Sequence, residues 1–168
     1  MQSAYHSLPT IDGVMQSAGK HFAARDVRYE ANNKEVRFSL DIAGAYPLEA
    51  GLKSWVRSVI LQRKQSIILV DSYEFVDTPL EIILSLMTPC NVNLDIPGEI
   101  QLFETSLAGR RKSGIGLITY DKTQLSVVVE DKPLQDAKLR SVWGIQLRRI
   151  LFKVVHILPQ GSVVINIS

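Results

Sequence analysis

The histidine near the start of the chain is the residue whose type most directly suggests a functional site. His6 lies in the stretch 5–13 (YHSLPTIDG), a short extended segment closed by an Asp-Gly turn, and Gln16 follows soon after. Neutral imidazole binds divalent metals such as zinc, and it also transfers protons near neutral pH. A zinc site usually needs about three or four protein ligands, so His6 predicts an incomplete metal site. The competing interpretation is a terminal-strand histidine hydrogen-bonded to backbone.

The other histidines and the neighbouring aspartate favour structural roles. His21 and His156 have no Cys, Asp or Glu partner at metal-ligand spacing, so we expect them to be packing or surface residues. Asp12-Gly13 is typical of a turn, because glycine adopts positive φ without strain. Cys90 is the only cysteine, and by itself it can form neither an internal disulfide nor a metal cluster.

Two groups of basic residues could contact an acidic ligand. Residues 110–112 (RRK) lie between Gly109 and Gly114 and predict a mobile basic loop. Arginine forks match carboxylate and sulfate, so this loop could grip an acidic polysaccharide; the alternative is a solvated loop. Arg148 and Arg149 are adjacent, but neighbours on a strand point to opposite faces and would not act together.

The aromatic residues offer a second kind of ligand contact. Trp55 and Trp143 could stack on sugar rings, although tryptophans in strand-rich domains more often pack in the core or at an edge. Tyr46 has the same bias. The sequence shows no Ser-His-Asp set, no glycine-rich phosphate loop and no paired carboxylates. We therefore expect no complete catalytic chemistry from this chain alone.

Length and composition limit the classes of protein to consider. The chain has 168 residues, enough for one domain with a substantial core, and we expect a single domain over 1–168. Hydrophobic residues make up 46% and charged residues 21%, as in globular proteins. The net charge of +2 is too small to favour nucleic acid or an anionic membrane as a partner. Residues 1–19 contain no apolar run that resembles a signal peptide.

The hydrophobic pattern predicts strands joined by turns. In 36–42 apolar and polar residues alternate, which places the apolar side chains on one face, and 22–30 is predicted as the hairpin partner across a turn at 32–34 (NNK). The stretch 67–70 (IILV) predicts a strand covered on both faces. Further strands are predicted at 52–62, 81–87, 101–104, 116–120, 125–129 and 162–167. This spacing favours an all-β fold, an antiparallel multi-stranded β-sandwich.

One segment carries conflicting signals. Within 147–158 the apolar residues recur at helical spacing, which alone favours an amphipathic helix. The β-branched content and the strand-rich surroundings favour a strand. We predict a strand.

Several stretches together resemble a known family. They are 5–13 (YHSLPTIDG), 39–47 (SLDIAGAYP), 49–57 (EAGLKSWVR), 86–88 (LMT) and 139–144 (LRSVWG). They are similar to the C-terminal, supersandwich-like β-sandwich of heparinase II/III-type polysaccharide lyases, and they cover most of the chain. The resemblance implies that the chain is part of a larger bacterial protein, with Met1 an artificial start and an N-terminal α/α toroid missing. The commoner family motif has Asn after the histidine, where this chain has Ser7.

The resemblance also implies a function for the parent protein. Such lyases cleave uronic-acid polysaccharides by β-elimination: a base removes the C5 proton, and the uronate carboxylate is neutralised as the enolate-like intermediate forms. Tyrosine and histidine commonly transfer the protons, and most of these residues lie in the toroid. The sandwich closes one wall of the cleft. Only His6 is carried over, as a cleft-lining residue or as one ligand of a zinc or calcium site in the full-length protein; we expect no cofactor in this chain.

The expected partners follow from the same resemblance. They are an acidic polysaccharide, bound through the full-length protein, and the missing toroid, with no nucleic acid or membrane. A face bared by the loss of the toroid would promote weak self-association, and the expected location is periplasmic or secreted. Two other functions stay open: a free-standing carbohydrate-binding module, which needs an exposed Trp55 or Trp143 platform on a sheet face, and a structural or assembly domain with an apolar partner interface.

Overall fold

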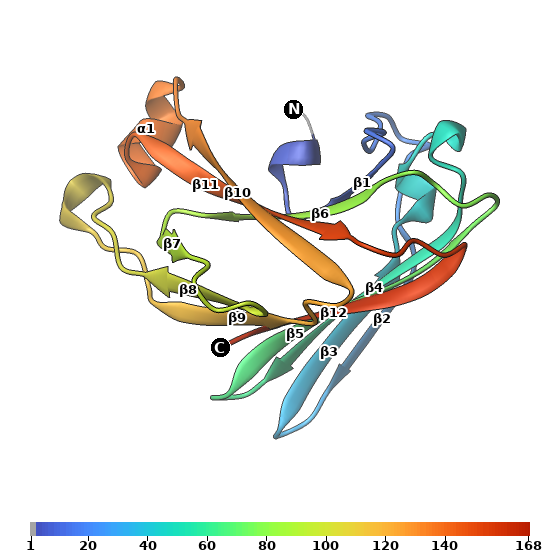
Figure 1. The fold of residues 1–168 in the computed structure, drawn as a ribbon, viewed down its shortest axis with the longest axis horizontal. Helices are drawn as coiled ribbons and strands as arrows, with labels where there is room; N and C mark the ends of the chain where they lie inside the picture. Colours follow the sequence, from blue (N-terminus) through green and yellow to red (C-terminus); the bar gives the residue numbers. More distant parts are fainter. Residues whose placement is uncertain (1–2) are drawn as a thin grey trace.

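The computed structural model describes residues 3–168. These residues form two antiparallel sheets packed face to face (Figure 1). The strands are β1 (Pro9–Ile11), β2 (Arg25–Ala31), β3 (Glu35–Asp41), β4 (Leu52–Gln62), β5 (Ser66–Phe75), β6 (Ile82–Thr88), β7 (Asn91–Asn93), β8 (Glu99–Phe103), β9 (Gly116–Tyr120), β10 (Leu125–Pro133), β11 (Gln146–Val154) and β12 (Gln160–Ile167). The large sheet has the order β2-β3-β4-β5-β12-β9-β8-β7, and the small sheet has the order β1-β6-β11-β10. The predicted all-β sandwich is confirmed.

Every predicted strand has a counterpart in the structure, although several have shifted bounds. The strands expected at 52–62 and 116–120 coincide with β4 and β9, and β2 pairs with β3 as the predicted hairpin. The Asn32 carboxamide stabilises the turn between them by accepting from the backbone N–H of Lys34 and Glu35, at 2.8 and 2.9 Å. This turn therefore depends on a side-chain acceptor and not on positive φ, which neither Asn32 nor Asn33 adopts.

The segment with conflicting signals is a strand, as predicted. Ile150 and Phe152 of β11 are buried in the core between the sheets, and Leu151 on the opposite face is buried as well. Because this strand buries residues on both faces, its apolar residues do not alternate simply. That explains why the sequence also fitted a helical period.

The short helices were not predicted. α1 (Ala137–Trp143) begins after Asp136, whose carboxylate accepts from the backbone N–H of Leu139 at 2.9 Å, and it ends at Gly144 with φ of 89°. The other helices are one-turn 3₁₀ elements: η1 (Ser3–Tyr5), η2 (Ala43–Ala45), η3 (Leu48–Ala50) and η4 (Ala108–Arg110). Among residues 3–168, none of the helices has the length and apolar character needed to cross a membrane.

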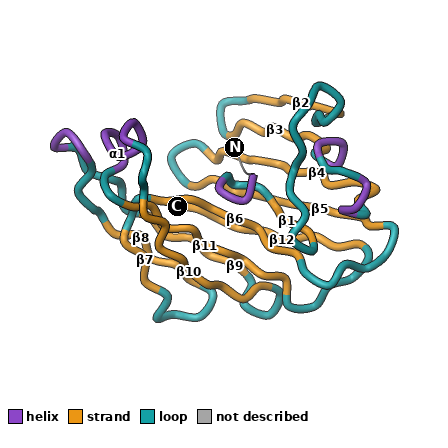
Figure 2. The backbone as a smooth tube through the Cα atoms, turned by 90° about the horizontal axis from the view of Figure 1, so that it is seen from above, coloured by secondary structure: helices purple, strands orange, loops and turns teal. Residues whose placement is uncertain are grey.

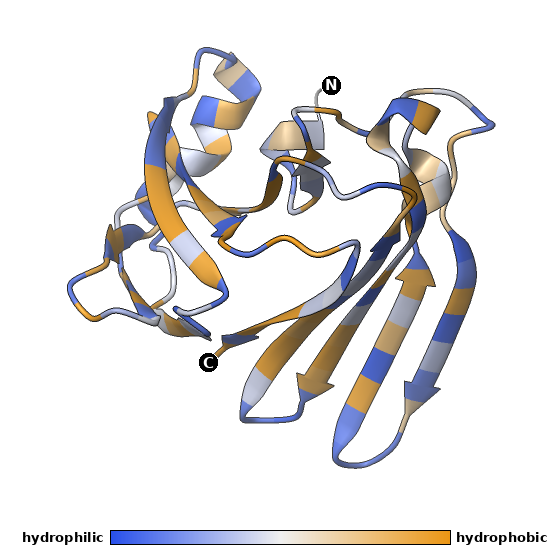
Figure 3. Cartoon of the chain, turned by 45° about the vertical axis from the view of Figure 1, so that its right-hand side comes forward, coloured by the Kyte–Doolittle hydropathy of each residue, from blue (hydrophilic) through white to orange (hydrophobic). Residues whose placement is uncertain are grey.

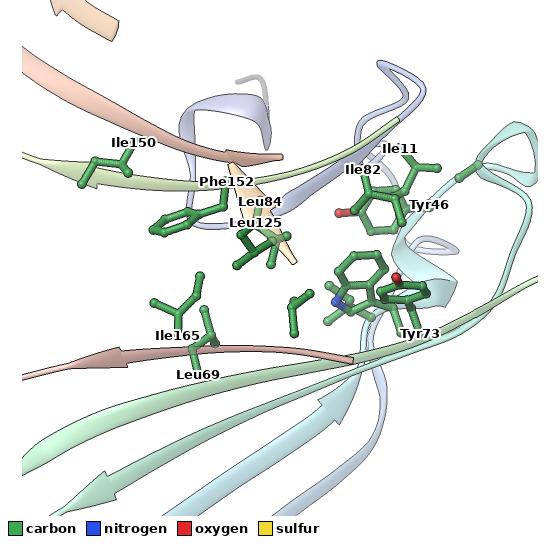
Figure 4. Packing of buried hydrophobic residues seen from close by; sticks show 14 of the residues in the cluster. Ile11, Tyr46, Leu69, Tyr73, Ile82, Leu84, Leu125, Ile150, Phe152 and Ile165 are labelled. Atoms are coloured by element: carbon green, nitrogen blue, oxygen red, sulfur yellow. The ribbon is translucent and has the colours of Figure 1, made fainter. Parts of the chain in front are cut away.

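The core lies between the two sheets and is rich in aromatic and branched side chains (Figure 4). Trp55 stacks on Tyr73 with ring centroids 5.3 Å apart, and Phe75 meets Trp55 edge-on at 6.4 Å. From the small sheet, Ile82 and Phe152 are fully buried in the same core, and Phe152 meets Tyr120 edge-on at 5.7 Å. Trp55 is thus a core residue and not a platform for sugar rings, in line with the expectation that tryptophans of strand-rich domains pack in the core.

The large sheet extends beyond the small one. Hydrophobic and hydrophilic residues alternate along β2 and β3 (Figure 3), yet the small sheet does not cover the apolar positions at this end. The prediction that 67–70 is covered on both faces is wrong. Leu69 is buried between the sheets, whereas Ile68 and Val70 point outward and stay half-buried, because the second layer packs on one face only.

Candidate functional site around His6

His6 directly follows η1, and this short helix lies over the outer face of the small sheet (Figure 1 and Figure 2). Its backbone is fixed locally: the N–H of His6 donates to the carbonyl of Ser3 at 3.0 Å, and its carbonyl accepts from the N–H of Leu8 at 2.8 Å. The imidazole itself is exposed. A rigid backbone therefore presents a solvent-accessible imidazole on this face.

A buried ion pair holds the residue after His6. Arg57 on β4 and Asp71 on β5 are direct cross-strand partners. The guanidinium meets the carboxylate in a bidentate geometry, with Nε–Oδ1 at 2.7 Å and Nη2–Oδ2 at 2.6 Å. The remaining terminal nitrogen of Arg57 donates to the backbone carbonyl of Ser7. The planar fork thus joins the large sheet to the N-terminal segment.

The ion pair is enclosed by protein. Arg57 is 7% exposed and Asp71 is fully buried. The indole Nε1–H of Trp55 donates to Asp71 Oδ1 at 2.9 Å, so the carboxylate accepts three hydrogen bonds from side chains. A buried charge is costly unless it is paired and hydrogen-bonded, and both requirements are met here.

Tyr46 gives a second attachment on the same side. Its hydroxyl donates to the carbonyl of Pro9, the first residue of β1, at 2.6 Å. Burial raises the pKa of Tyr46 well above its usual value; the Arg57 charge lowers it and the Asp71 charge raises it, both to a smaller extent. The hydroxyl therefore stays protonated near neutral pH and donates to the Pro9 carbonyl.

A second arginine holds the residue two positions before His6. Arg149 on β11 donates to the backbone carbonyl of Ala4 at 3.1 Å, although the two residues are 145 positions apart in sequence. Its other terminal nitrogen lies 3.1 Å from Glu130 Oε2 on β10, and Lys132 Nζ lies 2.8 Å from the same oxygen. The close Lys132 ammonium, and to a smaller extent the Arg149 charge, lower the pKa of Glu130 against the opposing effect of desolvation, so the carboxylate stays ionised near neutral pH.

Tyr5 covers these two cations. Arg149 Cζ lies 5.3 Å and Lys132 Nζ 5.7 Å from the centroid of its ring, within cation–π range. Ala4 and Ser7, on either side of His6, are thus each bound by an arginine that a carboxylate orients. We call Arg57–Asp71 and Arg149–Glu130 the two arginine clamps.

The clamps position His6 but do not complete a metal site. In the part of the chain that the structure describes, no group of three or more His, Cys, Asp and Glu side chains could hold a metal ion. A zinc or calcium site that includes His6 would therefore need at least one ligand from outside residues 3–168.

The other polar candidates have structural roles or lie apart from His6. Asp12 and Gly13 form the predicted turn with φ of 49° and 75°, and Asp12 Oδ1 accepts from the N–H of Leu80 and Glu81 at 2.8 and 2.7 Å. His21 lines an open pocket of about 530 Å³ beside η2 and η3. His156 lines a different pocket, at the loop between β11 and β12.

The predicted basic loop is anchored on α1. Arg111 donates to the carbonyl of Val142 at 2.8 Å, and Lys112 pairs with Glu104 at 2.6 Å. Two of its three cations therefore have protein partners, which differs from the mobile basic loop that was expected.

The adjacent arginines of β11 act separately, as predicted. Arg148 donates to the carbonyl of Cys90 at 3.0 Å, whereas Arg149 belongs to a clamp. Of the two tryptophans, Trp55 is fully buried, and Trp143 is 39% exposed on the short helix α1.

Sequence reasoning missed both clamps. Arg57 and Asp71 each occupy a position of an alternating strand that faces inward, between Trp55 and Val59 on β4 and between Leu69 and Tyr73 on β5. The sequence did contain a signal for the first clamp: a cation and an anion occupy core-facing positions of two adjacent strands. Such charges are rarely buried unless they are paired, so an ion pair could have been predicted.

Comparison with known proteins identifies the fold. Neither the protein-family models nor the curated proteins give a match to this sequence. Among solved structures, heparan sulfate lyase HepC from Pedobacter heparinus is similar with a TM-score of 0.70 and 16% identity, covering 99% of this chain and 24% of HepC. A heparinase III structure is similar with a TM-score of 0.63 and 12% identity, covering 96% of this chain and 23% of that one. The chain therefore has the fold of a portion of the heparan sulfate lyases and spans about a quarter of their length.

Proposed function

We propose that this chain is the non-catalytic β-sandwich part of a polysaccharide lyase that cleaves a uronic-acid-containing, glycosaminoglycan-like polysaccharide by β-elimination. The observation that carries the proposal is the coverage: 99% of this chain matches 24% of a heparan sulfate lyase. A segment that corresponds to a quarter of an enzyme, and that lacks a nucleophile–base set in its sequence, fits a supporting domain.

The chain's contribution to the reaction would be positional. The arginine clamps fix the backbone on both sides of His6, so that the imidazole keeps one place on the outer face of the small sheet. We place this face against the cleft, where His6 would contact substrate or supply one ligand to a divalent metal held mainly by the rest of the protein. Rigid support of this kind matters because small displacements of a functional group lower turnover strongly.

The remaining parts of the proposal concern the parent protein. An α/α toroid would supply the acid, the base and the groups that neutralise the uronate carboxylate, and a bacterial parent would work in the periplasm or outside the cell. A free-standing carbohydrate-binding module is less well supported, because Trp55 is buried and Trp143 lies on a helix and not on a sheet face.

The first test compares the chain with its parent. The purified chain is incubated with heparan sulfate, heparin and alginate, and the ultraviolet absorbance of unsaturated uronate is followed. We expect the chain alone to form no unsaturated product. The full-length parent protein should form it. Turnover by the chain alone would refute the non-catalytic role.

The second test concerns His6 in the active parent protein. We expect His6→Ala to lower turnover by about tenfold or more, the scale expected when a metal ligand or a proton-transfer group is lost. His21→Ala is the matched control, since His21 is also exposed but lies outside the clamped segment. Equal activity of the two variants would contradict the proposal that His6 acts at the substrate cleft.

A further inference from the structure

A second polar pocket lies away from His6, at the open side of the sandwich. Its volume is about 380 Å³, within the range of roughly 300–1,000 Å³ typical of small-molecule sites. The β9–β10 turn, the β11–β12 loop and the start of β12 all contribute residues to its lining. Its polar lining comprises Tyr73, Thr123, Gln124, His156, Gln160 and Ser162.

The ring of Tyr73 is buried, whereas its hydroxyl borders the pocket and has no hydrogen-bond partner among the described residues. The residue is only 6% exposed, with its ring packed 5.3 Å from the rings of both Trp55 and Phe75 (Figure 4). No group among residues 3–168 forms a hydrogen bond with this hydroxyl, which borders the pocket. Burial raises the pKa of Tyr73, so the hydroxyl stays protonated and can both donate and accept.

Gly161 keeps the hydroxyl in this place. It is the direct cross-strand partner of Tyr73, and a Cβ at this position would lie 2.6 Å from the hydroxyl oxygen. Aromatic rings commonly pack over a glycine on the neighbouring strand, and this explains the position of the Tyr73 ring. This packing does not account for the hydroxyl itself, which borders the pocket and is free to bond a ligand there.

The other lining groups indicate the class of ligand. They are carboxamides, hydroxyls and an imidazole, together with the apolar side chains of Leu158 and Val163, and no Asp, Glu, Lys or Arg contributes to this pocket. A charged ligand would lose hydration here without gaining a counter-ion. A sugar ring combines several hydroxyls with an apolar C–H face, which matches this combination.

We propose that this pocket binds an uncharged saccharide unit, and that the Tyr73 hydroxyl forms its central hydrogen bond. The inference does not rest on the proposed function, because it depends only on the pocket and its lining.

Titration of the isotopically labelled chain, followed by amide NMR, tests the proposal. The probes are glucose, galactose and N-acetylglucosamine, with glucuronate and glucosamine as charged counterparts. We expect saturable shifts at the amides of Thr123, Gln124 and Ser162 with at least one neutral sugar, and weaker binding of both charged ones. The proposal fails if no neutral sugar gives saturable shifts at high millimolar concentration, or if a charged sugar binds as tightly.

Two variants isolate the hydroxyl. Tyr73→Phe keeps the stacked ring and should weaken binding by about two- to tenfold, the loss expected for one hydrogen bond. Gly161→Ala should weaken it at least as much, because its Cβ displaces the hydroxyl. Tyr29→Phe, at an exposed tyrosine on β2, should leave binding unchanged. Wild-type affinity in Tyr73→Phe, with the spectrum of the folded chain retained, would overturn the role of the hydroxyl.

Discussion

At the scale of single residues, the arginine clamps show how charged side chains can position the backbone on both sides of an exposed histidine. Two nitrogens of Arg57 bind the carboxylate of Asp71, and the third donates to the carbonyl of Ser7. Arg149 reaches Ala4 in the same way from the other sheet. Since guanidinium offers five donors in a rigid plane, one side chain can satisfy a carboxylate and a backbone carbonyl together. A lysine at either position would not reproduce this geometry.

Removal of one partner of the buried pair should be far more harmful than removal of both. We expect Arg57→Met to lower the free energy of unfolding by about 3–5 kcal/mol, because Asp71 is left buried without its cation. The double variant Arg57→Met/Asp71→Leu should recover most of this loss, since no uncompensated charge remains. Urea denaturation followed by circular dichroism measures these differences.

An exposed pair is the matched control. Lys53 and Glu74 are also joined across β4 and β5, at 3.0 Å, but both side chains are about half exposed. Lys53→Ala should cost about 1 kcal/mol or less. If Arg57→Met cost no more than Lys53→Ala, burial of the ion pair would not be what makes it important.

At the scale of elements, the N-terminal strand depends on its turn. β1 is three residues long and pairs only with β6, so it has few backbone hydrogen bonds of its own. Asp12 extends this pairing, because its carboxylate accepts from the N–H groups of Leu80 and Glu81, which directly precede β6. The same residue has the positive φ that the turn requires.

Substitutions at Asp12 should separate these two roles. Asp12→Ala should lower the free energy of unfolding by about 2 kcal/mol, because it loses the acceptor and strains a positive φ. Asp12→Gly relieves the strain alone and should cost about half as much, and Asp12→Asn keeps both features and should stay near wild type. Hydrogen exchange at the amides of Leu80 and Glu81 reports the local effect. Equal stability of all three variants would show that the turn requires neither the Asp12 acceptor nor a residue that tolerates positive φ.

At the scale of the whole molecule, a four-stranded sheet covers an eight-stranded one. The inward face of the large sheet therefore continues past the core. One row of cross-strand partners runs from buried Leu69 through Val59 to Phe38 and Tyr29, and the outer two side chains are 39% and 67% exposed. Contiguous exposed apolar surface of this kind commonly marks an interface.

This uncovered end is a second surface, besides the face toward the missing toroid, on which we expect weak self-association of the isolated chain. Sedimentation velocity over a range of concentrations should show a rising average mass, and Phe38→Lys should reduce it because the charge disrupts the apolar row. Val164→Lys, at an exposed position on the outer face of the same sheet, is the matched control. A strict monomer at high concentration would contradict the expectation.

The sequence by itself determined the fold class and most strands, because strand alternation and turn residues are local signals. The strands at 52–62 and 116–120 were predicted with the bounds that β4 and β9 have, and the resemblance of 5–13 directed attention to His6. α1 was missed because a helix of seven residues, defined mainly by Asp136 and Gly144, is too short for a clear period.

Only the tertiary structure decided what surrounds His6. Arg57 and Asp71 meet because of the register between β4 and β5, and Arg149 reaches Ala4 across nearly the whole length of the chain. Such contacts depend on strand order, which no single strand's pattern encodes. The same reason explains why the hydroxyl of Tyr73 and the carboxamide of Gln124, in a distant turn, share one pocket, although nothing in their local sequence links them.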